Sequence, residues 1–318
     1  MNQLNLTKIL LTGGSGFLGC CLLDELGKNE NYSFHLPLRE NKLKPNVNYQ
    51  VFPYHDLNEN QDWSEALNGC EVVVHLAARV HIMKENSLDP LAEFRKTNVE
   101  GTLNLARQAA KMGIKRFIFL SSIKVNGEST ALNQPFKADD KPEPKDAYAI
   151  SKYEAEQGLL NIAKETQMEV VIIRPPLIYG PDVKGNFKQL LQIISKPFPL
   201  PFALIKNKRS FVGINNLISL INCCIKHPNA ANQIFLVSDG YDLSTKELIE
   251  KIAFVQNKSP FLVPVPKLIL LLGLTLLGKK ALYQRLCSSL QIDQSKNYHL
   301  LDWTPPFLAD DELKKCYK

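Results

Sequence analysis

A glycine-rich segment constrains the fold of this chain more than any other feature. Glycines occupy positions 13, 14, 16 and 19, directly after a short apolar and β-prone run at residues 8–11. A helical pattern then extends from residue 17 to about residue 26. A buried strand, a glycine turn and a helix in this order are typical of the phosphate-binding unit of a dinucleotide fold.

Each glycine has a predicted task in such a unit. Gly13 permits the tight turn, Gly16 lets the backbone approach a diphosphate, and Gly19 lets the helix pack closely on the strand. The free N–H groups and the positive dipole end of the helix attract the phosphates. The other predicted cofactor contacts of this segment are Ser15, Phe17 and Leu18.

The end of the second predicted strand, residues 32–38, bears on the choice between NAD and NADP. An acidic residue near this point commonly bonds the ribose 2′-OH of NAD. Arg39 stands there and favours NADP through a 2′-phosphate, whereas Glu40 beside it is compatible with NAD. Further along, Asp56 is a candidate acceptor for the adenine amine, with Leu57 beside it, although a plain loop aspartate has the same appearance.

Two further apolar runs end in residues suited to a ligand site. Residues 71–76 form a predicted strand that leads from Leu76 into the small Ala77 and Ala78, which would let a cofactor ribose lie against the backbone or simply allow strand–helix packing. His75 follows three valines and is interpreted as a core histidine. Residues 117–120 form another strand, ending in Ser121 and Ser122, at the carboxyl edge where open α/β sheets bind ligands.

Tyr148 and Lys152 are four residues apart and share one face of a predicted helix. A phenol has an unperturbed pKa of about 10, so it exchanges protons poorly at neutral pH. A lysine ammonium and an oxidised nicotinamide nearby would lower that pKa, making Tyr148 a general acid/base. Ser122 would donate to the same substrate oxygen and Lys152 would hold the nicotinamide ribose. A surface Tyr/Lys pair is the simpler interpretation of this spacing taken alone.

The ordered set of motifs resembles the extended short-chain dehydrogenase/reductase family, the NAD-dependent epimerase/dehydratase group. The resemblance covers nearly the whole chain, through the glycine segment, 56–57, 75–78, 98–102, 121–122, the Tyr148/Lys152 pair, 174–180, 185–187 and 209–212. It implies cofactor contacts for Asn98 and Pro175. It also implies substrate contacts for Ser122, Lys124, Asn186 and Arg209.

Three runs, 80–83, 121–127 and 184–187, resemble a bacterial subgroup described as UDP-glucose 4-epimerase-like, which includes 4-ketoreductases for O-antigen or capsule sugars. Lys124 stands where the family's dehydratases carry an acid, which argues against elimination of water. Asn126 replaces the tyrosine frequent in galactose epimerases. The resemblance implies hydride transfer at C4 of a UDP-hexose or UDP-N-acetylhexosamine, by an epimerase or a reductase, in a homodimer.

Two other functions remain open at this point. The first is a 4-epimerase of undecaprenyl-diphosphate-linked N-acetylhexosamine, and the second is a non-catalytic NADP-sensing scaffold. Retention of Ser122, Tyr148 and Lys152 argues against the scaffold.

The expected fold class is α/β, a doubly wound parallel Rossmann sheet with a smaller C-terminal α/β substrate-binding lobe. We expect the cofactor domain at 1–175 and the nucleotide-sugar lobe at 176–318. A strand at 234–237 and a helix from a capping box at 244–247 to about 253 are assigned to that lobe. The helix before the catalytic segment is expected at 99–112, and the loop 127–146 is either a cover or a solvated connection.

Composition narrows the classes of function that remain possible for this chain. The seven cysteines lack metal-ligand spacing, so no metal is expected, and a reduced cytoplasmic protein follows. The net charge of +6 suits an anionic substrate, but no basic stripe is interleaved with aromatics, so nucleic acid is not expected. The apolar run at 268–277 is too short to span a bilayer. It is either a core or subunit-contact helix or a peripheral membrane contact.

Overall fold

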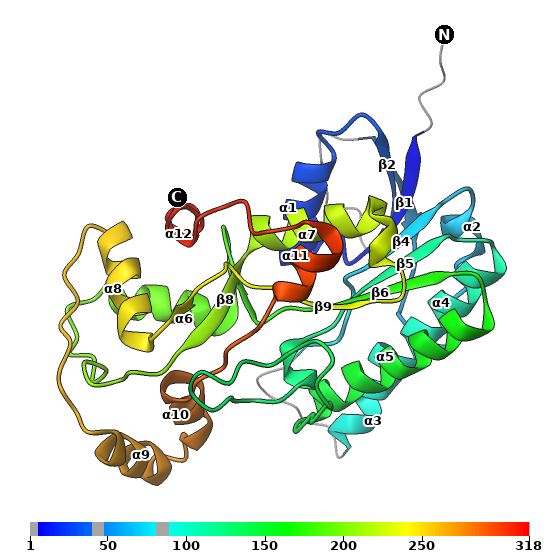
Figure 1. The fold of residues 1–318 in the computed structure, drawn as a ribbon. Coiled ribbons are helices and arrows are strands. Elements are labelled where there is room, and N and C mark those ends of the chain that lie inside the picture. Colours follow the sequence, from blue (N-terminus) through cyan, green and yellow to red (C-terminus); the bar gives the residue numbers. More distant parts are fainter. Residues whose placement is uncertain (1–5, 40–47, 81–88, 318) are drawn as a thin grey trace.

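Two sheets of unequal size organise the protein. The computed structural model describes residues 6–39, 48–80 and 89–317, and Figure 1 shows a larger and a smaller lobe. The larger sheet has seven parallel strands in the order β3-β2-β1-β4-β5-β6-β9. The order reverses between β1 and β4, which is the switch point where such sheets bind ligands. The strands are β1 Thr7–Thr12, β2 Tyr32–Leu38, β3 Tyr49–Pro53, β4 Val72–His75, β5 Arg116–Leu120, β6 Glu169–Arg174 and β9 Ile234–Leu236.

Alternating side chains of these strands build a core on each face of the sheet. Ile9 and Leu11 pack with α1 (Phe17–Leu26), α7 (Ile214–Lys226) and α11 (Ser295–Leu301) on one face. Leu10 packs with α2 (Ser64–Leu67), α4 (Thr102–Lys111) and α5 (Ala147–Glu165) on the other. This three-layer arrangement confirms the predicted α/β Rossmann fold.

The smaller lobe is built on a three-stranded sheet in the order β10-β8-β7, with β7 Leu177–Tyr179, β8 Arg209–Gly213 and β10 Asp242–Leu243. Its core combines these strands with α6 (Gly185–Ile194), α8 (Thr245–Val255) and α12 (Ala309–Lys315). The predicted capping box is confirmed, because Ser244 and Glu247 bond each other's backbone at the start of α8. Two further helices, α9 (Lys267–Leu276) and α10 (Lys280–Cys287), extend beyond this core.

One local prediction was wrong, and a second is confirmed with a different internal structure. The strand β9 exists, but it pairs in parallel with β6 in the large sheet rather than in the smaller lobe. The residues of β9 pair with the backbone at the open edge of β6. The chain therefore returns to the larger lobe after residue 175. The helix expected at 99–112 is divided, since a π-helical segment, Lys96–Gly101, precedes α4. The division of the chain at residue 175 stays a prediction.

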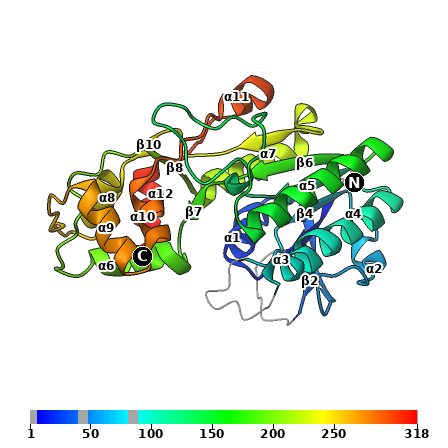
Figure 2. The same ribbon diagram turned by 90° about the horizontal axis from the view of Figure 1, so that it is seen from below.

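Short helical segments complete the structure around the large sheet. They are α3 (Pro90–Arg95), η2 (Ile123–Val125) and η3 (Pro228–Ala230). Figure 2 shows α3, α4 and α5 together on one side of the large lobe, with the smaller lobe beside it. No helix in the described part of the chain is long and apolar enough to cross a membrane.

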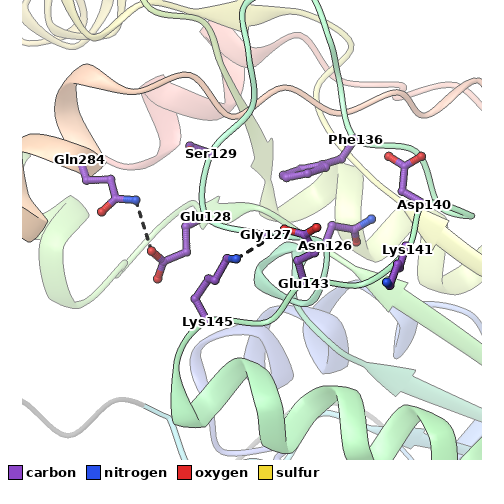
Figure 3. A pocket seen from close by; sticks show the side chains of 10 residues that line it. All are labelled: Asn126, Gly127, Glu128, Ser129, Phe136, Asp140, Lys141, Glu143, Lys145 and Gln284. Atoms are coloured by element: carbon purple, nitrogen blue, oxygen red, sulfur yellow. Dashed lines mark hydrogen bonds and ion pairs between the residues drawn. The ribbon is translucent and has the colours of Figure 1, made fainter.

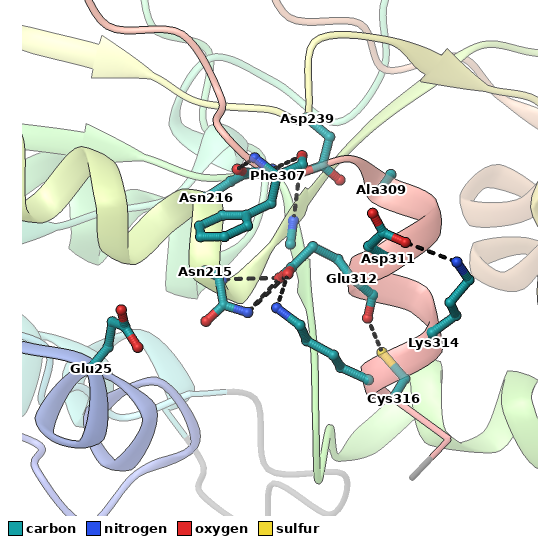
Figure 4. Close-up of polar contacts among 12 residues, drawn as sticks. Glu25, Asn215, Asn216, Asp239, Phe307, Ala309, Asp311, Glu312, Lys314 and Cys316 are labelled. Carbon is teal, nitrogen blue, oxygen red and sulfur yellow. Dashed lines mark hydrogen bonds and ion pairs between the residues drawn. The ribbon is translucent and has the colours of Figure 1, made fainter.

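A polar cluster joins the C-terminal helix to the rest of the molecule (Figure 4). Glu312 of α12 is fully buried and accepts hydrogen bonds from the backbone and side-chain nitrogens of Asn215 at 3.1 and 2.9 Å. Asp239 accepts from the Tyr179 hydroxyl at 2.6 Å and from Asn216 at 2.8 Å. Since α7 covers the large sheet, these bonds connect the two lobes.

Candidate active site

The glycine segment lies in close contact with the chain after β4. Gly13 has a φ of +73°, and a Cβ there would be 2.8 Å from the backbone nitrogen of Ala77. A Cβ on Gly19 would be 2.7 Å from the Cα of Gly14. Any side chain at either position would force the turn away from β4 or from α1. The N-terminus of α1 is therefore left open, with Gly16 exposed at its N-cap.

A cavity of about 720 Å³ opens at this turn. Its volume falls within the range usual for cofactor clefts. A second cavity of about 460 Å³ adjoins it, and both are lined by Arg39, Ala77 and Ala78. Asp56 and Leu57 line the second one. The first brings together the other predicted contacts near the turn, which are Gly13, Ser15, Gly16, Phe17, Leu18, Gly19 and Leu76. These glycine-lined surfaces and the free helix end fit a dinucleotide.

Ser122 lies at the carboxyl end of β5 and caps the short helix η2, where its hydroxyl accepts from the Lys124 backbone at 3.3 Å. The preceding Ser121 is buried and donates to Glu156 at 2.5 Å. Glu156 also pairs with Arg174 through two hydrogen bonds of 2.9 and 2.6 Å, and both side chains are almost fully buried. Glu156 thus joins α5 to the end of β5 through Ser121 and to β6 through Arg174.

Helix α5 carries Tyr148 and Lys152. Asp146 caps its N-terminus by accepting from the Ala149 backbone at 2.7 Å. The Tyr148 ring meets Phe94 edge-on at 6.0 Å between centroids. The Lys152 ammonium lies 4.0 Å from the centre of the Phe119 ring, a cation–π contact with β5. The Lys152 contact thus brings this part of α5 to the carboxyl end of β5, the strand that Ser121 and Ser122 directly follow.

Without cofactor, the pKa values of Tyr148 and Lys152 both shift in the direction that favours the uncharged side chain. Burial, and then the charge of Asp146, raise the pKa of Tyr148 to about 12. Burial lowers the pKa of Lys152 to about 7, partly offset by Glu156. The predicted lowering of the tyrosine pKa by Lys152 is therefore absent without cofactor. The positive charge of an oxidised nicotinamide remains as the predicted source of that lowering.

Lys124 is held next to the catalytic helix. Its ammonium pairs with the N-cap residue Asp146 at 2.5 Å. Asn126, one turn further, accepts from Arg174 at 2.9 Å and donates to the Lys137 carbonyl at 2.9 Å. Neither residue presents a carboxylate to the end of β5, in line with the predicted departure from dehydratases.

The segment after η2 encloses a third cavity, of about 600 Å³ (Figure 3). Asn126 and Phe136 lie on one side, and Glu128 bonds Gln284 of α10 at 3.3 Å on the other. The 127–146 segment thus contacts the smaller lobe instead of being only a solvated connection.

Arg209 has a second arginine nearby that no local sequence motif marks. Burial, and then the neighbouring charge of Arg285, lower the pKa of Arg209 to about 10. The Arg209 guanidinium donates to the Ser288 carbonyl at 3.0 Å, which joins β8 to the end of α10. Two guanidinium groups held close together are a favourable environment for an anion. Arg285 is 76 residues away along the chain, so only the tertiary structure reveals the pair.

Three predicted site residues are placed less directly. Asn98 is buried and its amide bonds the Arg79 backbone and, at 3.0 Å, the Ser151 hydroxyl, so it braces α5. Pro175 is buried, and its carbonyl accepts from the Ile123 backbone at 2.9 Å. Asn186 is the second residue of α6, and its side chain is outside the described part. Their ligand contacts stay predictions, and Glu40 also lies outside the described residues.

His75 is a core residue, as expected. It is fully buried between Thr12 at 2.7 Å and Thr102 at 3.0 Å, and burial lowers its pKa to about 3. Within residues 6–39, 48–80 and 89–317, no group of three or more metal-binding side chains occurs.

Comparison with known proteins identifies the family to which this sequence and fold are similar. The family model described as NAD dependent epimerase/dehydratase family matches residues 9–238. A protein named UDP-glucose 4-epimerase from Vibrio cholerae is 46% identical over 308 residues, covering 96% of this chain and 93% of that protein. An Escherichia coli O157:H7 protein named N-acetyl-alpha-D-glucosaminyl-diphospho-ditrans,octacis-undecaprenol 4-epimerase is 26% identical, with 96% and 93% covered.

Among solved structures, UDP-glucuronic acid 4-epimerase from Bacillus cereus in complex with NAD has the same fold. It aligns with a TM-score of 0.78 and 22% identity, covering 98% of this chain and 95% of that one. The motif order, the fold and the 46% identity agree with one another. The chain belongs to the NAD-dependent epimerase/dehydratase family, as the resemblance of its motifs implied.

Proposed function

We propose that this protein is an NAD-dependent epimerase that inverts C4 of a UDP-hexose or UDP-N-acetylhexosamine. The contact of Lys152 with Phe119 of β5 carries this proposal, because Leu120, the next residue of that strand, lines the glycine-lined cavity and Ser122 follows two residues later. The name of the Vibrio cholerae relative supports a nucleotide sugar as substrate.

Ser122, Tyr148 and Lys152 have different roles in the proposed reaction at the sugar's 4-oxygen. Bound NAD supplies a site that accepts a hydride and later returns it. Tyr148, as phenolate, takes the proton of the 4-hydroxyl and gives it back to the same oxygen after the sugar has turned over. Ser122 donates a hydrogen bond to that oxygen and holds it beside Tyr148. Lys152 binds the ribose of the cofactor and adds positive charge behind the phenolate.

Arg209 and Arg285 supply charge for the nucleotide diphosphate. Burial, and then the charge of Arg285, lower the pKa of Arg209. A doubly charged diphosphate between the two guanidinium groups would relieve their repulsion. This places the nucleotide against β8 and α10, with Asn186 of α6 on the same lobe as a further contact.

A dehydratase fits the site less well. The residues after Ser122 are Ile123, which is buried, and Lys124, which is paired with Asp146. Elimination of water needs an acid beside the active-site hydroxyl, and neither residue supplies one. A 4-ketoreductase needs the same three side chains as the epimerase, and it would consume NAD(P)H. The relative's name favours the epimerase.

A sugar linked to undecaprenyl diphosphate is the second candidate substrate. The Escherichia coli relative carries this substrate in its name, and α9 exposes the apolar side chains described below. Either substrate class would feed synthesis of bacterial surface polysaccharide, the role that we propose for the product. A cytoplasmic location, a homodimer and a preference for NADP through Arg39 stay predictions.

Replacement of Tyr148 by phenylalanine tests the proposed proton transfer. Tyr148→Phe should lower turnover by roughly 10²- to 10⁴-fold, because it removes the only group that exchanges the proton. Tyr153→Phe on the same helix is the matched control and should change turnover by less than about threefold. Both variants should keep the NAD affinity of the unmodified protein. Near-normal turnover in Tyr148→Phe would overturn the assignment. Lack of turnover of UDP-sugars by the unmodified protein, with NAD bound, would favour the 4-ketoreductase or the lipid-linked substrate.

A further inference from the structure

Helix α9 turns an apolar face outward. Leu268, Ile269, Leu272 and Leu276 are 66%, 59%, 56% and 88% exposed, and they recur at a spacing that keeps them on one side of a helix. Leu277, directly after the helix, is 69% exposed. The opposite side is anchored, because Leu270 is buried with Ile205 and Cys287. No element among the described residues covers the outward side.

The charged residues near α9 in the sequence are of one sign. Between Glu250 and Asp293 the chain has no acidic residue, and it has six basic ones: Lys251, Lys258, Lys267, Lys279, Lys280 and Arg285. These six equal the whole formal net charge of +6, so the rest of the chain is balanced. Lys267 begins α9, and Lys279 and Lys280 follow it, all three exposed. The apolar face is thus bordered by cations at both ends.

We infer that α9 is an interfacial helix that lies on an anionic lipid bilayer. Its outward leucines would enter the acyl boundary while the lysines at its ends meet lipid phosphates. With ten residues the helix is about 15 Å long, too short to cross the hydrocarbon core. The molecule would therefore rest on the membrane surface without spanning it.

The position of α9 suits this orientation. Figures 1 and 2 both show it at the far end of the smaller lobe, away from β1 and β2. Contact with a flat surface there is not obstructed by the large lobe. A second copy of the chain is a poorer occupant, because a two-fold contact through this face would bring the same cationic border against itself. The inference does not depend on which sugar the enzyme binds.

Vesicle sedimentation of the full-length protein tests the inference. The vesicles contain phosphatidylcholine alone or with about 30% phosphatidylglycerol, which supplies the anionic surface. Leu272→Glu/Leu276→Glu places two negative charges on the outward face of α9. Tyr298→Glu/Leu308→Glu is the matched control, because it adds the same charges at apolar side chains that are 56% and 70% exposed on α11 and before α12. Lys279→Gln/Lys280→Gln removes charge and leaves the apolar face.

The unmodified protein should sediment with the anionic vesicles and much less with the neutral ones. The α9 variant should bind at least about tenfold more weakly and the lysine variant should lose most of its preference for the anionic lipid. The control variant should bind normally. Absence of sedimentation, or equal binding by the α9 variant, would overturn the inference. So would an ultracentrifugation result in which the α9 variant alone dissociates an oligomer, because the face would then bind a second copy.

Discussion

At the scale of single residues, burial governs the catalytic pair before any ligand binds. Lys152 is almost fully buried against Phe119, and its pKa falls to about 7, whereas the pKa of Tyr148 rises to about 12. The sequence predicted the pair and its spacing on α5. It did not reveal these shifts, because they depend on how much water the folded protein removes from each group.

The lowered pKa of Lys152 predicts a pH dependence of stability. Between about pH 7 and the pKa of about 10.5 in the unfolded chain, the folded protein has lost the proton that the unfolded chain retains. Stability contributed by this group therefore rises with pH in that window. Relative to Lys152→Met, the free energy of unfolding of the cofactor-free protein should increase by up to about 1.4 kcal/mol per pH unit. Urea unfolding at about pH 7.5 and about pH 9 measures this, and a constant difference would contradict it.

Arg285 illustrates a second limit at this scale. Arg209 was predicted from its local motif, but its partner comes from α10, and no local pattern marks it. Residues brought together only by tertiary folding, such as Arg285 or Glu312 with Asn215, could not be predicted from one sequence.

At the scale of elements, α5 makes two ion pairs of different kinds, one with strand β6 and one with helix α3. Glu156 and Arg174 form a buried pair in which Glu156 also accepts from the Ser121 hydroxyl, whereas Glu154 pairs with Arg95 of α3 at the surface. At the start of the chain, the apolar runs and the glycine turn determine the strands and the helix directly. The sequence therefore predicted β1, α1 and β2 closely. The position of β9 in the large sheet was not predicted, because an edge strand of three residues takes its position from its neighbour β6.

Two substitutions on α5 compare these pairs. Glu156→Gln should lower the free energy of unfolding by about 3–5 kcal/mol, because Arg174 keeps a buried charge without its partner. Glu154→Gln, two residues away, should cost less than about 1 kcal/mol, since water screens the exposed pair. Chemical denaturation of both variants gives the comparison. Equal losses would show that burial of the Glu156 pair does not govern the stability of this helix.

At the scale of the whole molecule, the two lobes are joined by later parts of the chain. Helices α7 and α11 and strand β9 return to the large sheet, and α12 packs on β8 and α8 of the smaller lobe. Glu312 connects α12 with Asn215 of α7, next to the polar cluster of Asp239 (Figure 4). This connection fixes the lobe that carries Arg209 relative to the lobe that carries Tyr148.

Glu312→Ala should destabilise the protein by about 2–4 kcal/mol, because it leaves the partly buried nitrogens of Asn215 without an acceptor. Asp311→Ala is the matched control in the same helix, where the side chain pairs with Lys314 at the surface, and should cost less than about 1 kcal/mol. Thermal and urea unfolding measure both effects. A similar small loss in both variants would show that the lobes are held together without Glu312.

Proton NMR of UDP-N-acetylglucosamine and UDP-glucose, each incubated with the purified protein and a trace of NAD⁺, would detect the proposed epimerisation at C4. We expect the galacto isomer of at least one sugar to appear while no NADH accumulates, because the hydride taken from C4 is returned to it. Under the same conditions, the Tyr148→Phe variant should leave the NMR spectrum of each sugar nearly unchanged. If a protein that binds NAD converts neither UDP-sugar, the proposed C4 epimerisation of UDP-sugars is contradicted.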